Sequence, residues 1–172
     1  MIRSALGYTP RVLHELDRIQ DQQIPASYVC GYARGKLANV ERIRRDRVAL
    51  YTLPAREREL VGGECILVGF FLVAEDYVES CEQSATLLIG IDTARVLAVL
   101  RPVGLQATMR VLCNGLLLRE EIRGRDVAAD STVSVAGALR QYELLVSDRS
   151  REGVVCMQVI AGSIRVYRFT LA

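Results

Sequence analysis

The feature that most constrains the fold of this chain is a series of short apolar stretches that begins at Tyr28. The stretches are rich in Val, Leu, Ile and Tyr, and Gly, Pro, Asn, Asp or Ser separate them at the interval typical of all-β proteins. No regular alternation with helical patterns is present, which argues against a parallel sheet. The pattern predicts ten or eleven strands, near residues 28–33, 47–53, 64–74, 85–91, 94–101, 105–113, 116–123, 131–136, 139–146, 154–161 and 164–171.

The dipeptide Asn114-Gly115 is the clearest turn signal in the chain. Both positions of a two-residue hairpin turn take positive φ, which Asn and Gly tolerate. The turn predicts that Cys113 lies opposite Leu116 and that the paired strands, 105–113 and 116–123, have one apolar face and one charged face.

Two further dipeptides, Asp92-Thr93 and Gly162-Ser163, are predicted to be hairpin turns between neighbouring strands. The run from Ile66 to Val73 is apolar at almost every position. Such a strand needs cover on both faces, so the chain is expected to form two layers.

These patterns predict a mainly β fold, either an antiparallel β-sandwich or a flattened, jelly-roll-like barrel, with an N-terminal α-helix. A second short helix is expected over 37–45. We expect a single domain over 1–172, in which a helical segment, 1–26, packs on a β-rich core, 27–172. The N-terminal helix is expected at about 10–23, and its boundaries and apolar stripe rest on Thr9, Pro10, Val12, Leu13, Leu16, Ile19 and Pro25.

Basic residues gather in one segment of a chain whose net charge is only +2, so any electrostatic function must be local. Tyr28, Tyr32 and Tyr51 flank the segment and would suit base stacking if exposed. We expect contact with RNA or with an anionic membrane surface there. A solvated, salt-bridged surface is the alternative, because Glu41 and Asp46 are interleaved. The candidate binding residues are Arg34, Lys36, Arg42, Arg44, Arg45 and Arg47.

Cysteine spacing and apolar run length indicate a cellular location. The five cysteines lie far apart, with no Cys-x-x-Cys, so they predict neither a zinc site nor a disulfide framework. We therefore expect reduced thiols and a cytoplasmic protein. The N-terminus lacks the apolar region of a signal peptide, and the longest apolar run, Cys65–Ala74, is too short to cross a membrane, so no transmembrane segment is expected.

No catalytic, metal or cofactor site is predicted, and the chain is expected not to be an enzyme or to have a small-molecule substrate. The single histidine, His14, lies in the middle of the expected helix without a nucleophile nearby in sequence. An acidic group, Glu75, Asp76, Glu79 and Glu82, lacks the spacing of a calcium loop. A solvated acidic loop explains it more simply.

These features favour a non-enzymatic structural protein that self-associates into a homo-oligomer. Compact jelly-roll-like proteins include virus-encoded coat and matrix proteins, and on this analogy of architecture a matrix-like role, with a place in the virion, is expected if the chain is virus-encoded. The alternative is a small-ligand-binding or enzymatic β-barrel with a pocket between the sheets. Candidate pocket residues for that alternative are Thr108, Gln141, Tyr142 and Gln158.

Overall fold

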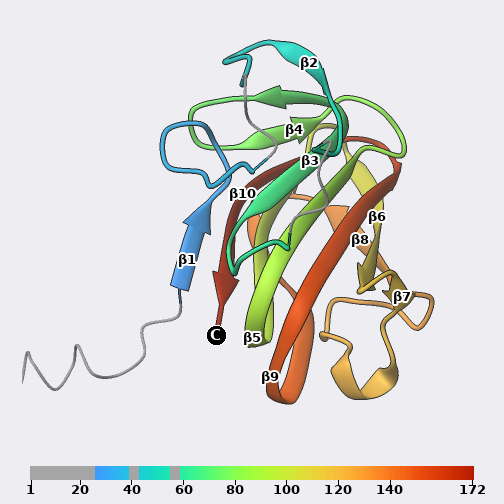
Figure 1. Cartoon of the computed structure of the whole chain (residues 1–172). Coiled ribbons are helices and arrows are strands. Elements are labelled where there is room, and N and C mark those ends of the chain that lie inside the picture. The colour runs from blue at the N-terminus through green and yellow to red at the C-terminus, as the bar shows by residue number, and fades with distance from the viewer. Residues whose placement is uncertain (1–25, 39–42, 55–58) are drawn as a thin grey trace, which may run out of the picture.

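The computed structural model describes residues 26–38, 43–54 and 59–172 (Figure 1). It confirms a mainly β, antiparallel fold, with ten strands joined in one hydrogen-bonded sheet. The strands are β1 (Ala26–Val29), β2 (Val48–Tyr51), β3 (Cys65–Val73), β4 (Val78–Ser80), β5 (Thr86–Pro102), β6 (Gln106–Cys113), β7 (Leu116–Leu117), β8 (Thr132–Ala136), β9 (Arg140–Ala161) and β10 (Ile164–Leu171).

The helix expectations have a different outcome. The described residues contain no α-helix, and their one helical element is a 3-10 turn, η1 (Glu120–Ile122). The N-terminal helix expected at 10–23 lies outside the described residues. The second expected helix lies partly outside them, and its two described ends, Leu37 and Arg45, instead form parallel bridges to Cys65 and Val73. In the described part of the chain, no helix is long and apolar enough to cross a membrane.

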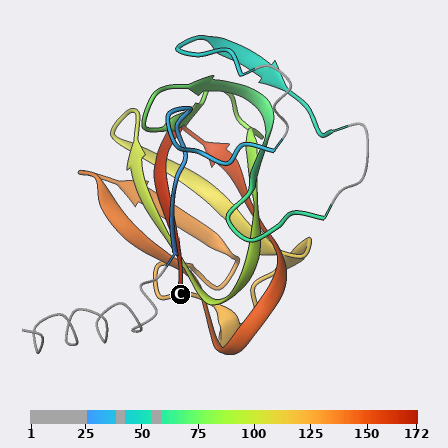
Figure 2. The ribbon, with the colours of Figure 1, turned by 60° about the vertical axis from the view of Figure 1, so that its left-hand side comes forward.

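Two long strands, β5 and β9, fold the sheet over into two layers (Figures 1 and 2). The first half of β5 pairs with β3 and with the second half of β9. The second half of β5 pairs with β10 and with the first half of β9. The short strand β4 pairs with both β3 and β10, so it also links the layers along another side. The apolar core therefore lies between two layers that share the same strands.

Alternation along each strand places the core side chains. On β6, Ala107, Met109 and Val111 are buried, while Arg110 is exposed on the outer face. This is the apolar face that the Asn114-Gly115 turn predicted. The facing layer contributes the fully buried side chains of Leu100, Tyr142, Leu144, Ile164 and Phe169, among others.

The predicted turn at Asn114-Gly115 is confirmed, with φ values of 49° and 77° and with Cys113 opposite Leu116. The pairing stops after Leu117, however, because β7 is only two residues long. From Gln106 to Arg110, β8 pairs with β6 instead. The predicted strand at 116–123 is therefore mostly loop and 3-10 turn.

The other two predicted hairpins are wrong. Asp92 and Thr93 lie inside the continuous strand β5, where a register shift against β9 bends the strand without reversing it. Gly162, with a φ of 71°, does turn the chain, but no β9–β10 pairing is present in the described sheet. Instead, the end of β9 pairs with β6 in one layer, and β10 pairs with β5 in the opposite layer.

The apolar run that was predicted to need cover on both faces is β3, and only its first half has such cover. Cys65, Ile66 and Leu67 are at most 5% exposed, whereas Phe70 is 41% exposed. Its neighbours β5, β4 and β2 confirm its interior position in the sheet.

Candidate functional site

Aromatic rings, arginines and carboxylates meet where the turn after β1 touches the end of β3. The backbone N–H of Tyr32 donates to the carbonyl of Ala74 at 2.9 Å, and the N–H of Ala74 donates to the carbonyl of Tyr77 at 2.9 Å. On the other side, the N–H of Cys30 donates to the carbonyl of Tyr167 in β10 at 2.9 Å. We call this site the aromatic–arginine cluster, and it comprises Tyr32, Arg45, Asp46, Tyr77, Glu79, Arg165 and Tyr167.

A glycine allows the turn to come this close. A Cβ atom on Gly31 would lie 2.0 Å from the carbonyl oxygen of Glu75, which is much closer than a van der Waals contact. Because Gly31 has no side chain, the loop that carries Tyr32 can lie directly against the β3–β4 connection. Figure 1 shows this loop, in blue, beside the β3–β4 hairpin.

The first half of the cluster is a tyrosine pair with an ion pair beside it. The rings of Tyr77 and Tyr167 have centroids 5.2 Å apart and are tilted by 44°. The guanidinium of Arg165 lies 4.9 Å from the centre of the Tyr77 ring, and its Nε donates to Oε2 of Glu79 at 2.6 Å. This hydrogen bond to a carboxylate raises the pKa of Arg165 above its ordinary value, so the arginine is a permanent cation. The ion pair holds Arg165 against the aromatic ring.

The second half of the cluster is built on Tyr32. Its hydroxyl donates a hydrogen bond to Oδ2 of Asp46 at 3.0 Å, and this bond raises the pKa of Tyr32 above its ordinary value. The guanidinium of Arg45 lies 4.9 Å from the centre of the same ring. A ring, a cation and an anion thus occur together twice at neighbouring positions of one surface.

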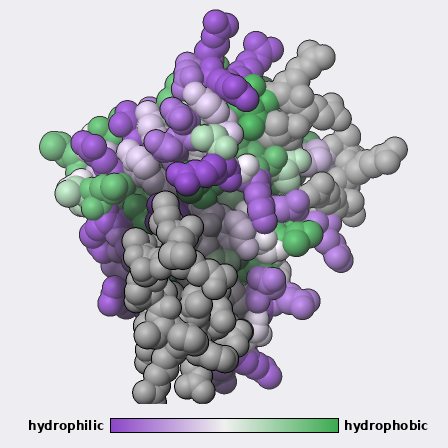
Figure 3. Space-filling view, turned by 90° about the vertical axis from the view of Figure 1, so that its left-hand side faces the viewer, coloured by the Kyte–Doolittle hydropathy of each residue, from purple (hydrophilic) through white to green (hydrophobic). Residues whose placement is uncertain are grey.

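Viewed from the side on which β1 lies, the described surface is mixed, with hydrophilic side chains next to apolar ones (Figure 3). The cluster has the same amphipathic character, because it combines the apolar faces of tyrosine rings with phenol hydroxyl, guanidinium and carboxylate groups. All three tyrosines are partly accessible to solvent. Such a surface can stack against a flat apolar ligand face and also form hydrogen bonds at its edge.

The structure distributes the predicted basic residues unevenly. Arg42 lies outside the described residues, and only Arg45 belongs to the cluster. Lys36 lies 4.9 Å from the centre of the Tyr28 ring, which also packs against Gly63. The remaining predicted residues, Arg34, Arg44 and Arg47, are exposed.

The expected stacking role of Tyr51 does not fit its position. Tyr51 is only 6% exposed, and its hydroxyl accepts a hydrogen bond from the backbone N–H of Arg44 at 3.3 Å. Tyr77, Glu79, Arg165 and Tyr167 were not among the predicted site residues. They come from two segments that are more than 80 residues apart, and no local spacing signals that they meet.

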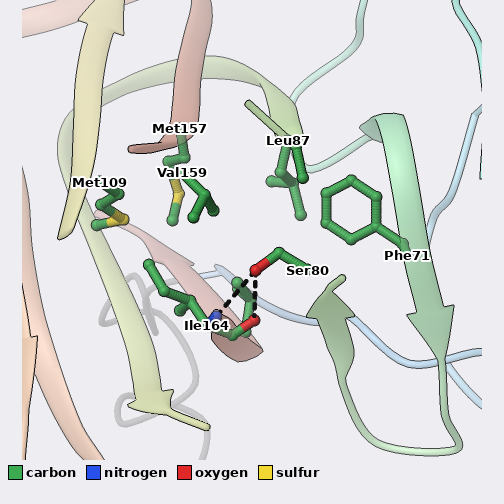
Figure 4. Close-up of a pocket in the computed structure, with 9 residues that line it drawn as sticks. Phe71, Ser80, Leu87, Met109, Met157, Val159 and Ile164 are labelled. Atoms are coloured by element: carbon green, nitrogen blue, oxygen red, sulfur yellow. Dashed lines mark hydrogen bonds between the residues drawn. The ribbon is translucent and has the colours of Figure 1, made fainter. Parts of the chain in front are cut away.

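A small cavity lies between the layers, where the alternative expectation placed a ligand pocket (Figure 4). Its volume is about 10 Å³, which is about the space of one water molecule, and its lining is mostly apolar. Its polar groups satisfy each other, since Ser80 Oγ accepts from the N–H of Ile164 at 2.9 Å and donates to its carbonyl at 3.5 Å. This cavity is too small for a small-molecule ligand.

The polar residues proposed for such a pocket do not line it. Thr108 and Gln158 alternate with buried neighbours and so lie on outer faces of the sheet, and Gln141 is exposed. Tyr142 is fully buried, and its hydroxyl accepts a hydrogen bond from the N–H of Ala136 at 3.3 Å. In the part of the chain that the structure describes, no group of three His, Cys, Asp or Glu residues is arranged to hold a metal ion.

Comparison with known proteins identifies the family. The model of the thioredoxin-like C-terminal domain matches residues 25–171. The chain belongs to this family. The match covers every strand described above, although the family member itself contains no Cys-x-x-Cys sequence. No curated protein sequence matches the chain significantly.

Parts of two solved structures align with this family member. A family two carbohydrate esterase from Cellvibrio japonicus aligns with a TM-score of 0.51 and 13% identity, over 62% of this chain and 30% of the esterase. A family two carbohydrate esterase from Clostridium thermocellum, in complex with cellohexaose, aligns with a TM-score of 0.43 and 11% identity, over 56% of this chain and 27% of that one. The chain thus spans less than a third of either esterase.

These findings correct the functional expectation from the sequence. A self-associating, virus-encoded, matrix-like protein that contacts RNA or an anionic membrane surface is contradicted, because the chain belongs to a domain family of thioredoxin-like proteins. Its fold also matches part of a carbohydrate esterase. The expectation was wrong because two-layered β folds serve many unrelated functions, so the analogy with viral proteins carried no information about a site.

Proposed function

We propose that this chain is a non-catalytic binding module that holds a saccharide at the aromatic–arginine cluster. The observation that carries the proposal is the pairing, at that cluster, of partly accessible tyrosine rings with fixed ion pairs. Under this proposal the folded-over sheet is a flattened, jelly-roll-like barrel that serves as a rigid support for the site.

The chemistry of a sugar ring explains why this combination suits it. A pyranose has a face of C–H groups, which packs against an aromatic ring, and an edge of hydroxyl groups, which need hydrogen-bond partners. The Tyr77–Tyr167 pair offers the ring faces, and Arg165 with Glu79 offers donors and acceptors beside them. The ion pair is already formed, so little side-chain entropy is lost when the ligand binds.

Two comparisons support the proposal. The family name places such domains at the C-terminus of thioredoxin-like proteins, which fits a module that serves another domain. The esterase from Cellvibrio japonicus, whose name states that it acts on carbohydrates, has the same fold over 62% of this chain. The small volume of the interior cavity supports a surface site in preference to an enclosed one.

Affinity electrophoresis against a panel of soluble neutral polysaccharides, followed by calorimetric titration with oligosaccharides of any retarding polymer, tests the proposal. We expect Tyr77→Ala to weaken binding by at least tenfold, since truncating an aromatic residue at the centre of a binding site costs about 2 kcal/mol or more and about 1.4 kcal/mol is tenfold. Arg165→Gln should weaken binding as well, because it removes the cation that pairs with Glu79.

The matched control is Arg140→Ala. Arg140 also stacks on a tyrosine, Tyr142, with its guanidinium 3.6 Å from the ring centre, but it lies on β9 outside the cluster. This variant should bind like the wild type. The proposal fails if no polysaccharide of the panel binds, or if a folded Tyr77→Ala variant binds as tightly as the wild type.

A further inference from the structure

Exposed apolar side chains lie on the outer face of the sheet next to the aromatic–arginine cluster. Phe70 in β3 is 41% exposed, and Leu50, directly opposite it in β2, is 59% exposed. The next pair on this face is Leu72 with Val48, and Val48 is 55% exposed. Phe71, between Phe70 and Leu72, is buried, so the other four side chains are on the outer face. We call these four residues the apolar strip.

The strand register joins the apolar strip to the cluster. Leu72 lies opposite Glu79 of β4, and Glu79 lies opposite Arg165 of β10. Residues directly opposite each other on paired strands have their side chains on the same face. The row that contains Val48, Leu72, Glu79 and Arg165 therefore crosses the neighbouring strands β2, β3, β4 and β10 on one outer face. The strip and the cluster form one continuous surface.

The Phe70 end of this surface repeats the chemistry of the Tyr77 end. Oε1 of Glu82 accepts a hydrogen bond from the backbone N–H of Phe70 at 2.8 Å. This bond fixes a carboxylate at the residue that carries the exposed ring, just as an ion pair fixes Glu79 near the Tyr77 ring. Gly69 leaves room for it, since a Cβ atom there would lie 2.5 Å from the same oxygen. An aromatic ring with a fixed hydrogen-bond acceptor thus occurs at both ends.

The two rings are separated along the strand direction. The N–H of Ala74 donates to the carbonyl of Tyr77 at 2.9 Å, so Tyr77 lies level with a residue four positions beyond Phe70. At about 3.3 Å per strand residue, Phe70 and Tyr77 are about 13 Å apart along the strands, roughly the length of three linked pyranose rings. Leu72 lies between them on the same face. A single sugar ring is too short to contact both ends.

We propose that the ligand of this surface is an extended, β-1,4-linked oligosaccharide that runs along β3 from the Tyr77–Tyr167 pair to Phe70. The inference rests on the proposed saccharide function and extends it to the class of sugar chain. Linkage through equatorial bonds at both ends of each ring makes a nearly straight ribbon, whose C–H faces match a straight line of apolar contacts. An α-1,4-linked chain curves away from such a line, so it contacts only one end.

Calorimetric titration with β-1,4-linked oligosaccharides of glucose, mannose and xylose, from the disaccharide to the hexasaccharide, tests the proposal. A disaccharide covers one ring, whereas a tetrasaccharide reaches both. In at least one series we expect the tetrasaccharide to bind about tenfold more tightly than the disaccharide or better, since an aromatic anchor is typically worth that much. The hexasaccharide should add little. Maltohexaose, an α-1,4-linked chain of glucose, should show no such gain over maltose.

Substitutions at Phe70 separate the two ends of the surface. Phe70→Ala should weaken tetrasaccharide binding about tenfold and leave disaccharide binding unchanged, whereas Tyr77→Ala should weaken both. Phe70→Leu removes the ring but keeps an apolar side chain, so it should show the same selective loss even if the alanine variant does not fold. The matched control is Leu105→Ala, which truncates a 94% exposed side chain between β5 and β6 and should bind like the wild type.

Failure of this inference differs from failure of the proposed function. Equal affinities for disaccharide and tetrasaccharide, or a folded Phe70 variant that binds the tetrasaccharide as tightly as the wild type, would overturn the extended site while the saccharide function stands. Maltohexaose binding that also depends on Phe70 would overturn the β-1,4 class. If no polysaccharide or oligosaccharide binds at all, the proposed function fails, and this inference fails with it.

Discussion

The carboxylate of Glu143 ties an edge of the sheet to the loop that covers it, and neutralising it should weaken the fold in a pH-dependent way. Glu143 lies in β9 and is 8% exposed. Its Oε1 accepts from Nε of Arg95 at 2.7 Å, and its Oε2 accepts from the backbone N–H of Arg125 at 3.2 Å. The N–H of Glu143 in turn donates to Oδ2 of Asp126 at 2.7 Å.

The substitution Glu143→Gln keeps the size of the side chain and removes its charge. Arg95 forms two contacts with Oε1, and charge-assisted hydrogen bonds are each worth about 1.5–3 kcal/mol. The Arg95 side chain is 45% exposed, so solvent screens part of this energy. We therefore expect a loss of about 2 kcal/mol in the free energy of unfolding at pH 7, or roughly 4–8 °C in Tm for a chain of this length.

The pH dependence follows from the pKa of Glu143. Burial by itself raises that pKa, but hydrogen bonds from Arg125 and Arg95, together with their charges, outweigh it and hold the pKa below the ordinary value. A carboxylate with a lowered folded-state pKa contributes stability above its unfolded-state pKa and loses it as the pH falls through the folded-state value. The difference between wild type and Glu143→Gln should thus be full at pH 7 and shrink below about pH 4.

Urea denaturation of both proteins at a series of pH values measures this difference, with equal m-values as the check that the unfolded states match. The control is Glu152→Gln, which neutralises an exposed glutamate on the same strand and should leave the stability within about 0.5 kcal/mol of the wild type. Equal stabilities of wild type and Glu143→Gln at pH 7, or a difference that persists unchanged in acid, would refute the reasoning.

Two further pairs of substitutions test the β6 face and its turn. Val111→Asp places an unpaired charge at a position that is 0% exposed, so we expect a chain without a cooperative thermal transition, whereas Arg110→Asp on the outer face should still melt cooperatively. Calorimetry of both variants tests this expectation, and a cooperative melt of Val111→Asp would show that Val111 does not lie on the buried face of β6. Asn114→Ala loses a side-chain hydrogen bond from the N–H of Val154 and puts alanine at a φ of 49°, which should cost about 1–2 kcal/mol in urea denaturation. Asn114→Gly should cost less, because glycine tolerates that φ; an equal loss in both variants would count against the backbone argument.

Several elements could be predicted from the sequence because their signals are local. The turn at Asn114-Gly115 depends on the φ preferences of two adjacent residues, and the structure has it at the predicted positions. The buried face of β6 follows from the period of two along a strand. The antiparallel, mainly β class follows from the repeated apolar stretches and turn residues.

Strand partnership could not be predicted, because it depends on contacts between distant segments. Turn-forming residues at Asp92-Thr93 are compatible with a reversal, and also with the bend that the structure has within β5. The chain bends here without reversing because the long strand β9 pairs with β5 on both sides of the bend. Similarly, Gly162 turns the chain locally, but only the packing of the two layers places the end of β9 and β10 in opposite layers.

The functional groups divide in the same way. The sequence by itself determined the mainly β class, the turn at Asn114-Gly115 and the concentration of arginine near Arg45. Only the tertiary structure brought Tyr77 next to Tyr167. The physical reason is that backbone and side-chain preferences act over a few residues, whereas a site is made by the packing of layers, which joins residues that share no local pattern.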